Sequence, residues 1–245
     1  MIIHPPGGTT VLPARVSARP TPDLRLDEAI ALRRCVLYRR AFHGSAVGCP
    51  GPLLRFDAVA NWCRFEGVTV DVASGDEFDR ATAARIPAAQ TVVRCRDHRV
   101  MRAAAHAGAG RYVVDDIDQI ARLRMGLAAN PMRVLVDTTE QRPDVLAAEV
   151  AEHGRLELIG LHYRVGHTDL AALAATVDEL FAQMVRISRE HAVMLTRVSL
   201  GDVDLADFAD PPALRRAADL IDGVVEDGCA RFRYPRPALT VSISA

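Results

Sequence analysis

This chain of 245 residues contains no lysine, so all 30 of its basic side chains other than histidine are arginines. Chemistry that needs a lysine amine is therefore excluded within these residues. A genomic preference for arginine codons would explain the bias without reference to function. The five cysteines form no CxxC pair, which argues against a disulfide framework, and they read as small apolar fillers of a reducing compartment.

Long apolar runs and concentrated charge are also missing. No apolar run approaches the 18 residues typical of a membrane span, and the N-terminus lacks the pattern of a signal peptide. The formal net charge is −1, and no cluster of basic residues is interleaved with aromatic ones. We therefore expect a cytoplasmic protein that binds neither nucleic acid nor membranes.

The chain divides into an N-terminal arm and one α/β domain. Residues 1–34 are rich in Pro, Gly, Thr and Arg, with a short helix expected around Asp27 to Arg34. Residues 35–245 alternate between apolar, β-branched runs and helical patterns, which is typical of parallel βαβ units. The predicted strands are Val68–Ala73, Thr91–Arg94, Arg111–Val114, Met132–Val136, Leu156–Val165, Thr196–Leu200 and Leu239–Ile243.

An eighth strand would have to come from residues 45–56. Pro50 and Pro52 cannot donate to a strand ladder and Gly51 weakens it further, so we expect this first strand to be damaged or absent. Strict alternation of strands and helices over this length favours a (β/α)8 barrel over an open doubly wound sheet.

Polar residues interrupt two of the predicted strands. Side chains alternate faces along a strand, so in "GVTVDVAS" Asp71 lies opposite the valines and faces the barrel interior. The same counting in "LIGLHYRVGHT" sends Leu158, Gly160, His162 and Arg164 inward. An ionised carboxylate inside a barrel needs a partner. We expect that partner to be Arg164 or His162.

These inward residues have two interpretations. Asp71, His162 and Arg164 could form a satisfied polar cluster that only fixes strand register, or they could line a pocket at the carboxyl ends of the strands, where barrel sites lie. A metal held by His162 and His167 is disfavoured because their spacing runs through a strand end without a fixed carboxylate. A Ser74–His162–Asp71 triad is disfavoured because there is no nucleophile elbow.

The order of motifs from about Leu37 to Ala245 resembles the barrel domain of the fold-type III pyridoxal-phosphate decarboxylases. This resemblance implies a TIM-like barrel of the type found in the N-terminal domain of alanine racemase. The similarity is greatest to the diaminopimelate branch of the diaminopimelate and ornithine decarboxylases. "VDVASGDE" resembles that family's D-V-x-S-x-x-E, and "GAGRYVVDDIDQIARL" its G-V-x-R-I-V-V-D-S-x-x-E-L. "LELIGLHYRVGHT" resembles G-L-H-x-H-I-G-S, and "TRVSLGDVD" stands where the family has L-D-L-G-G-G.

The resemblance implies a degenerate cofactor site. Counted back without gaps from Asp71, the family's A-V-K-A-N segment puts Pro52 at the position of the Schiff-base lysine. Arg164 stands at the ring-stacking histidine, His167 at a serine near the phosphate, and Asp202 follows Gly201 in place of a second glycine. The family's E-P-G-R falls on residues 242–245, so its arginine is missing. The family positions retained are Asp71, Ser74, Glu77, Asp115, His162, Gly166 and Gly201.

The resemblance also implies that these residues lack the family's C-terminal β-domain. We therefore expect a non-catalytic binding or regulatory module without a Schiff base, a bound cofactor or a metal. Its expected pocket residues are Asp71, His162, Arg164 and His167. Two alternatives remain: a lysine-free enzyme acting on a small carboxylate or amino acid, and a protein that binds pyridoxal phosphate non-covalently. Self-association, or pairing with a related decarboxylase, would cover apolar surface at the barrel mouth.

Overall fold

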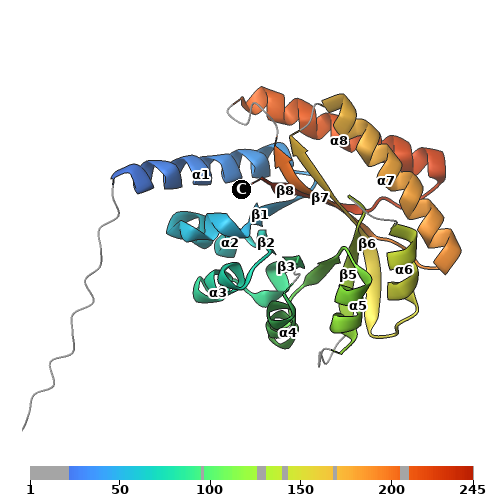
Figure 1. Ribbon diagram of the computed structural model, residues 1–245. Helices are drawn as coiled ribbons and strands as arrows, with labels where there is room; N and C mark the ends of the chain where they lie inside the picture. Colours follow the sequence, from blue (N-terminus) through green and yellow to red (C-terminus); the bar gives the residue numbers. More distant parts are fainter. Residues whose placement is uncertain are drawn as a thin grey trace, which may run out of the picture.

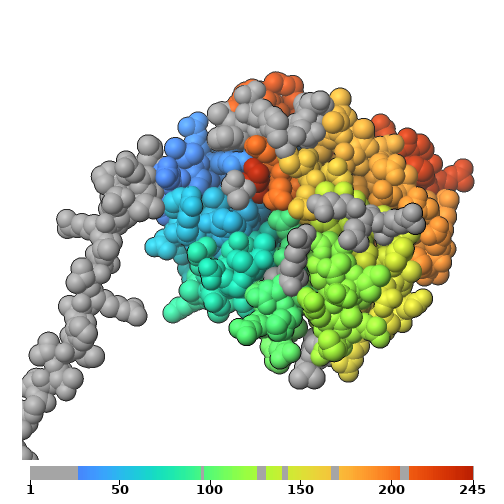
Figure 2. Space-filling view, viewed as in Figure 1, coloured from blue at the N-terminus to red at the C-terminus, as the bar shows by residue number. Residues whose placement is uncertain are grey.

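The computed structural model describes residues 22–94, 97–125, 131–139, 143–167, 170–204 and 210–244. These residues form a closed barrel of parallel strands surrounded by helices (Figure 1). In the space-filling view the colours follow the sequence around the molecule, so consecutive βα units lie side by side (Figure 2). No described helix combines the length and apolar character that crossing a membrane requires.

The strands pair in sequence order, and the last pairs with the first. Closure of this parallel sheet confirms the predicted (β/α)8 barrel. The strands are β1 Ala46–Pro50, β2 Thr69–Val72, β3 Thr91–Arg94, β4 Arg111–Val114, β5 Met132–Asp137, β6 Leu156–His167, β7 Arg197–Asp204 and β8 Ala238–Ile243.

Helices cover the outside of the barrel (Figure 1). Several begin with a side-chain cap: Ser74, Asp97, Asp116 and Asp210 each accept a hydrogen bond from a backbone N–H two or three residues later. The helices are α1 Pro22–Ala41, α2 Asp57–Glu66, α3 Gly75–Ala83, α4 His98–Ala107, α5 Ile117–Arg124, α6 Pro143–Ala151, α7 Leu170–His191 and α8 Pro211–Phe232, with 3-10 turns η1 Gly51–Arg55 and η2 Ala88–Gln90.

The first strand is intact, so the expectation of a damaged or absent strand was wrong. β1 pairs with both β2 and β8. Pro50 is its last residue, and Pro52 lies beyond it in η1, where the chain turns toward α2. The prolines therefore mark the end of the strand, where a missing N–H is tolerated, rather than interrupting it.

The helix expected at Asp27 to Arg34 is longer and forms part of the barrel. It extends over α1, so the boundary drawn after residue 34 falls inside a helix. Cys35 and Tyr38 are fully buried on its inner face, and the Tyr38 hydroxyl donates to the carbonyl of Val203 in β7 at 3.3 Å.

The barrel interior has its own small apolar cluster, separate from the larger core beneath the helices. It consists of Val92, Val113, Leu135 and Ile159, one residue from each strand from β3 to β6. Their strand neighbours, such as Val93 and Val114, belong to the outer core. This cluster fills the middle of one half of the barrel and supports the polar residues at the strand ends.

One inward assignment in β6 was wrong. Leu158 belongs to the outer core, and Ile159 takes the interior place, because the β5–β6 register shifts at this point. Simple alternation cannot anticipate such a bulge. His162, beyond the shift, is buried beside the interior residue Ser199.

Gly160 lies at this bulge, where the β6 backbone approaches β7 closely. A Cβ atom there would lie 2.0 Å from the carbonyl oxygen of Arg197, which is backbone and cannot move aside. Gly160→Ala should therefore lower the free energy of unfolding by about 3 kcal/mol. Gly154→Ala is the matched control, because a Cβ there meets nothing within 4 Å. Urea unfolding measures both, and equal stabilities would contradict this account of the bulge.

Candidate functional site

A polar pocket lies at the carboxyl ends of the strands. Its volume is about 520 Å³, which is within the usual range for small-molecule sites. It combines two guanidinium groups with four carboxylates. The described residues that line it are Ala73, Ser74, Gly75, Arg94, Asp97, Val113, Asp115, Gln119, Asp137, Arg164 and Asp202.

Asp71 lies inside the barrel, as predicted, at 5% exposure. Its Oδ2 atom has no hydrogen-bond partner among the described residues. Burial raises the pKa of its carboxyl group, and the Arg94 guanidinium opposes that rise. The predicted partner was wrong, because Arg94 is the main cation acting on Asp71, while Arg164 forms its ion pair with Asp137.

His162 is buried at 1% exposure, and its Nδ1 lies 3.0 Å from the Ser199 hydroxyl. Its Nε2 has no partner among the described residues. Burial, followed by the nearby Arg94 charge, lowers the pKa of this imidazole to about 3. A Cβ at Gly201 would lie 2.6 Å from Cε1 of His162, so the retained glycine is what admits the ring.

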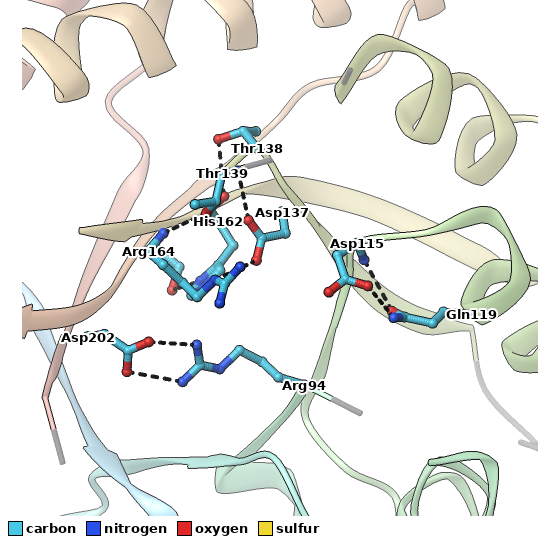
Figure 3. A network of polar contacts seen from close by, with 10 residues as sticks. Arg94, Asp115, Gln119, Asp137, Thr138, Thr139, His162, Arg164 and Asp202 are labelled. Atoms are coloured by element: carbon cyan, nitrogen blue, oxygen red, sulfur yellow. Dashed lines mark hydrogen bonds and ion pairs between the residues drawn. The ribbon is translucent and has the colours of Figure 1, made fainter. Parts of the chain in front are cut away.

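Arg164 joins the ends of β5 and β6. Its Nε lies 3.6 Å from Oδ2 of Asp137, and its backbone N–H donates to the Thr139 hydroxyl at 3.0 Å. The other Asp137 oxygen accepts from the Thr139 backbone N–H at 2.8 Å (Figure 3). Asp137 was not predicted from the sequence, although it lies two residues after the interior Leu135 and so shares its face.

Arg94 was also missed, although it lies two residues after the interior Val92. Its guanidinium faces the Asp202 carboxylate through two contacts, Nη1–Oδ2 at 3.3 Å and Nη2–Oδ1 at 3.4 Å (Figure 3). Asp202 has a φ of 52°, a conformation that favours glycine, and the β7–β8 register shifts between Leu200 and Val203. A carboxylate therefore occupies a glycine-like position at the mouth.

Two retained family positions form a helix cap. The Ser74 hydroxyl accepts from the Glu77 N–H at 3.3 Å, and Glu77 Oε2 accepts from the Ala73 N–H at 2.7 Å. This reciprocal pair resembles a capping box at the start of α3. A Cβ at Gly51 would lie 2.4 Å from the same Glu77 oxygen, so Glu77 also contacts the turn after β1.

Asp115 is part of a similar arrangement before α5. The Gln119 amide group donates to the Asp115 carboxylate, and its oxygen accepts from the Asp115 N–H at 3.1 Å (Figure 3). The same amide group also donates to Asp116 at 3.0 Å. Gln119 is almost fully buried, so its amide fixes the Asp115 carboxylate at the pocket wall.

The remaining predicted positions lie near the end of β6. Gly166 has a φ of 65°, which explains a glycine there. The His167 backbone pairs with Asp204, but its side chain lies outside the described part of the structure. Among the described residues, no three His, Cys, Asp or Glu side chains come together as metal ligands.

Comparison with known families agrees with this geometry. The model of the family described as "Pyridoxal-dependent decarboxylase, pyridoxal binding domain" matches residues 55–202, more than half of the chain. The chain belongs to this family. The match begins inside η1, downstream of β1.

Curated relatives of this family member include diaminopimelate decarboxylases. The protein from Actinosynnema pretiosum is 28% identical over 255 residues, covering 90% of this chain and 57% of the relative. The protein from Mycobacterium tuberculosis is 25% identical over 260 residues, covering 90% of this chain and 58% of the relative. The chain thus spans less than three-fifths of the length of these relatives.

Solved structures of decarboxylases share the fold. Diaminopimelate decarboxylase from M. jannaschii superposes with a TM-score of 0.73 at 15% identity, covering 89% of this chain and 59% of that one. Lysine/ornithine decarboxylase from Vibrio vulnificus, complexed with putrescine, gives 0.72 at 14% identity, with 89% and 61% covered. These likenesses show that the chain shares the barrel fold of these structures.

The buried imidazole leads to a prediction about pH. Because the folded pKa of His162 is about 3 and its ordinary value is 6.5, the unfolded chain binds a proton that the folded chain excludes between these values. The contribution of His162 to stability is therefore complete above pH 6.5 and is lost as the pH falls toward 3. Between these two pH values, the free energy of unfolding of the wild type should decrease by about 1.4 kcal/mol for each unit by which the pH is lowered, relative to that of His162→Asn.

NMR tests the same point without a substitution. The His162 imidazole shifts should stay constant from about pH 8 to pH 5 in the folded protein and titrate in urea near the ordinary histidine value. Titration of His162 in the folded protein near neutral pH would contradict the assigned burial.

Proposed function

We propose that this chain is a decarboxylase-like barrel that binds a small amino acid or carboxylate without using covalent pyridoxal chemistry. In this role it would act as a binding or regulatory module. The observation that carries the proposal is the composition of the mouth pocket, whose described lining places Arg94 and Arg164 among four aspartates and contains no lysine.

The lack of an amine is the first support. A pyridoxal aldehyde needs a primary amine for its Schiff base, and these residues contain no lysine. The interior positions of β1 are Gly48, which pairs with Thr69, and Pro50, which pairs with Asp71. Pro52, the position reached by gapless counting, lies in η1. Whichever of these three positions corresponds to the family's lysine, its side chain has no amine. The residues present therefore do not fit a covalently held cofactor.

The charge of the pocket is the second support. Its described lining carries two guanidinium groups, those of Arg94 and Arg164, against four aspartates, so negative charge is in excess. A phosphate dianion is disfavoured by this surplus of carboxylates, and Asp202 already contacts Arg94. A zwitterionic amino acid suits both signs, because a guanidinium fork pairs with its carboxylate and an aspartate accepts its ammonium.

An alternative is an enzyme that uses Asp71, His162 and Arg164 without lysine. Its favourable observation is that Oδ2 of Asp71 and Nε2 of His162 are buried without hydrogen-bond partners among the described residues. Neither residue belongs to the described lining of the mouth pocket, whereas Arg164 does. The low pKa of His162 argues against it as a general base at neutral pH, because a base with a pKa of about 3 has little driving force to take a proton. We therefore favour binding over catalysis.

The absence of an amine is tested with pyridoxal phosphate. Titration of the purified protein should give no imine absorbance band, and borohydride reduction followed by peptide mass spectrometry should find no adduct on barrel residues. Calorimetry run in parallel detects non-covalent binding, which would support the pyridoxal-phosphate-binding alternative. An adduct mapped to the barrel would refute the proposal.

The ligand class is tested by screening. L-lysine, L-glutamate, diaminopimelate and simple carboxylates should be examined by thermal shift and then by calorimetry. Arg164→Leu should weaken binding at least about tenfold, because it removes a charge-assisted contact. Arg133→Leu is the matched control, since Arg133 is 60% exposed beside Glu157, outside the pocket lining. An unchanged affinity in Arg164→Leu would exclude Arg164 from the site.

A further inference from the structure

Arg94 is the cation that interacts with several carboxylates at the barrel mouth. Its side chain is only 18% exposed, and three carboxylates, those of Asp71, Asp202 and Asp137, act on it. Asp71 lies in the barrel interior and Asp137 is committed to Arg164, so both are fixed in place. Two of the three carboxylates that act on Arg94 would therefore remain if Asp202 turned away.

Asp202 is held much less firmly. Its side chain is 39% exposed, and its two hydrogen bonds within the described part of the chain are with the Arg94 guanidinium. Its φ of 52° lies in the left-handed region, which is unfavourable for a residue with a Cβ. A rotation of this one side chain would free the Arg94 fork while leaving the backbone and the other ion pair in place.

The surroundings of Arg94 are built to receive polar groups. Nη1 of Arg94 lies 3.6 Å from the place a Gly201 Cβ would occupy, and the His162 ring lies against the same place. The Ser242 hydroxyl acts on the buried Asp71 carboxylate, as Arg94 does. Nε2 of His162 is buried without a hydrogen-bond partner among the described residues. Unpaired buried polar atoms are rare in folded proteins and commonly mark places where a water or a ligand binds.

We propose that Arg94 is the anion-binding residue of the mouth. In the absence of a ligand its guanidinium binds the Asp202 carboxylate, and the carboxylate of a ligand displaces Asp202 from it. A carboxylate is the expected ligand group because it matches the two-point contact that Asp202 makes now. The exchange keeps the number of ion pairs constant, so only anions that can also contact the rest of the pocket would displace Asp202. This exchange deepens the proposed function, and it rests on that function only for the identity of the ligand.

The test uses acetate and inorganic phosphate as probes at constant ionic strength, with binding followed by the NMR shifts of the Gly201 amide and the Arg94 Nε–H. Asp202→Asn keeps the shape of the side chain, and Asp202→Gly suits the positive φ, so both variants should fold with an unchanged or higher Tm. Both should bind the probes about tenfold more tightly than the wild type. Arg94→Gln combined with Asp202→Gly should lose that gain.

Asp97→Asn is the matched control. Asp97 lines the same pocket and caps α4, a role that asparagine can also fill, so this variant removes one negative charge without releasing Arg94. If Asp97→Asn gained as much affinity for the anions as the Asp202 variants, the gain would come from the change in net charge alone, and the proposal would be overturned. An absence of gain in both Asp202 variants would overturn it as well.

The two proposals fail separately. If the wild type binds no amino acid but the Asp202 variants gain anion binding that depends on Arg94, the exchange stands and the proposed ligand class is wrong. If the wild type binds an amino acid through Arg164 and the Asp202 variants gain nothing, the binding function stands and the exchange is wrong.

Discussion

The Arg94 guanidinium at the end of β3 is the charge on which the barrel mouth depends. Barrel closure brings the carboxyl ends of the strands into one ring, so carboxylates from β2, β5 and β7 come close to a single cation. Without that cation, Asp71 would be a buried carboxyl group with no nearby positive charge of comparable effect. The same charge, together with burial, keeps His162 neutral.

Several of the residues that the chain shares with its family have clear structural duties. Ser74 and Glu77 cap the helix that follows β2. Gly201 provides the space for His162. Duties of this kind do not depend on a cofactor. A barrel of this family can therefore keep its fold while the chemistry at its mouth changes, which is the premise of the function proposed here.

Much of the fold could be predicted from the sequence because its signals are local. Apolar runs located seven strands closely, and β3 and β4 were predicted to the residue. The misses have physical causes. β1 is a short strand that ends in proline, and its partners β2 and β8 are decided by barrel closure. The bulge at Ile159 depends on the β5–β6 register, which no local pattern reveals.

The sequence by itself determined that no lysine amine is available, that βα units alternate, and that Asp71, His162 and Arg164 face inward, because composition and the two-residue period of a strand are properties of the chain alone. Only the tertiary structure decided the pairing. Arg164 contacts Asp137, and Arg94 contacts Asp202, 108 positions away in the chain. Which charges meet at a barrel mouth depends on strand register and closure, and these are set by packing between segments distant in the sequence.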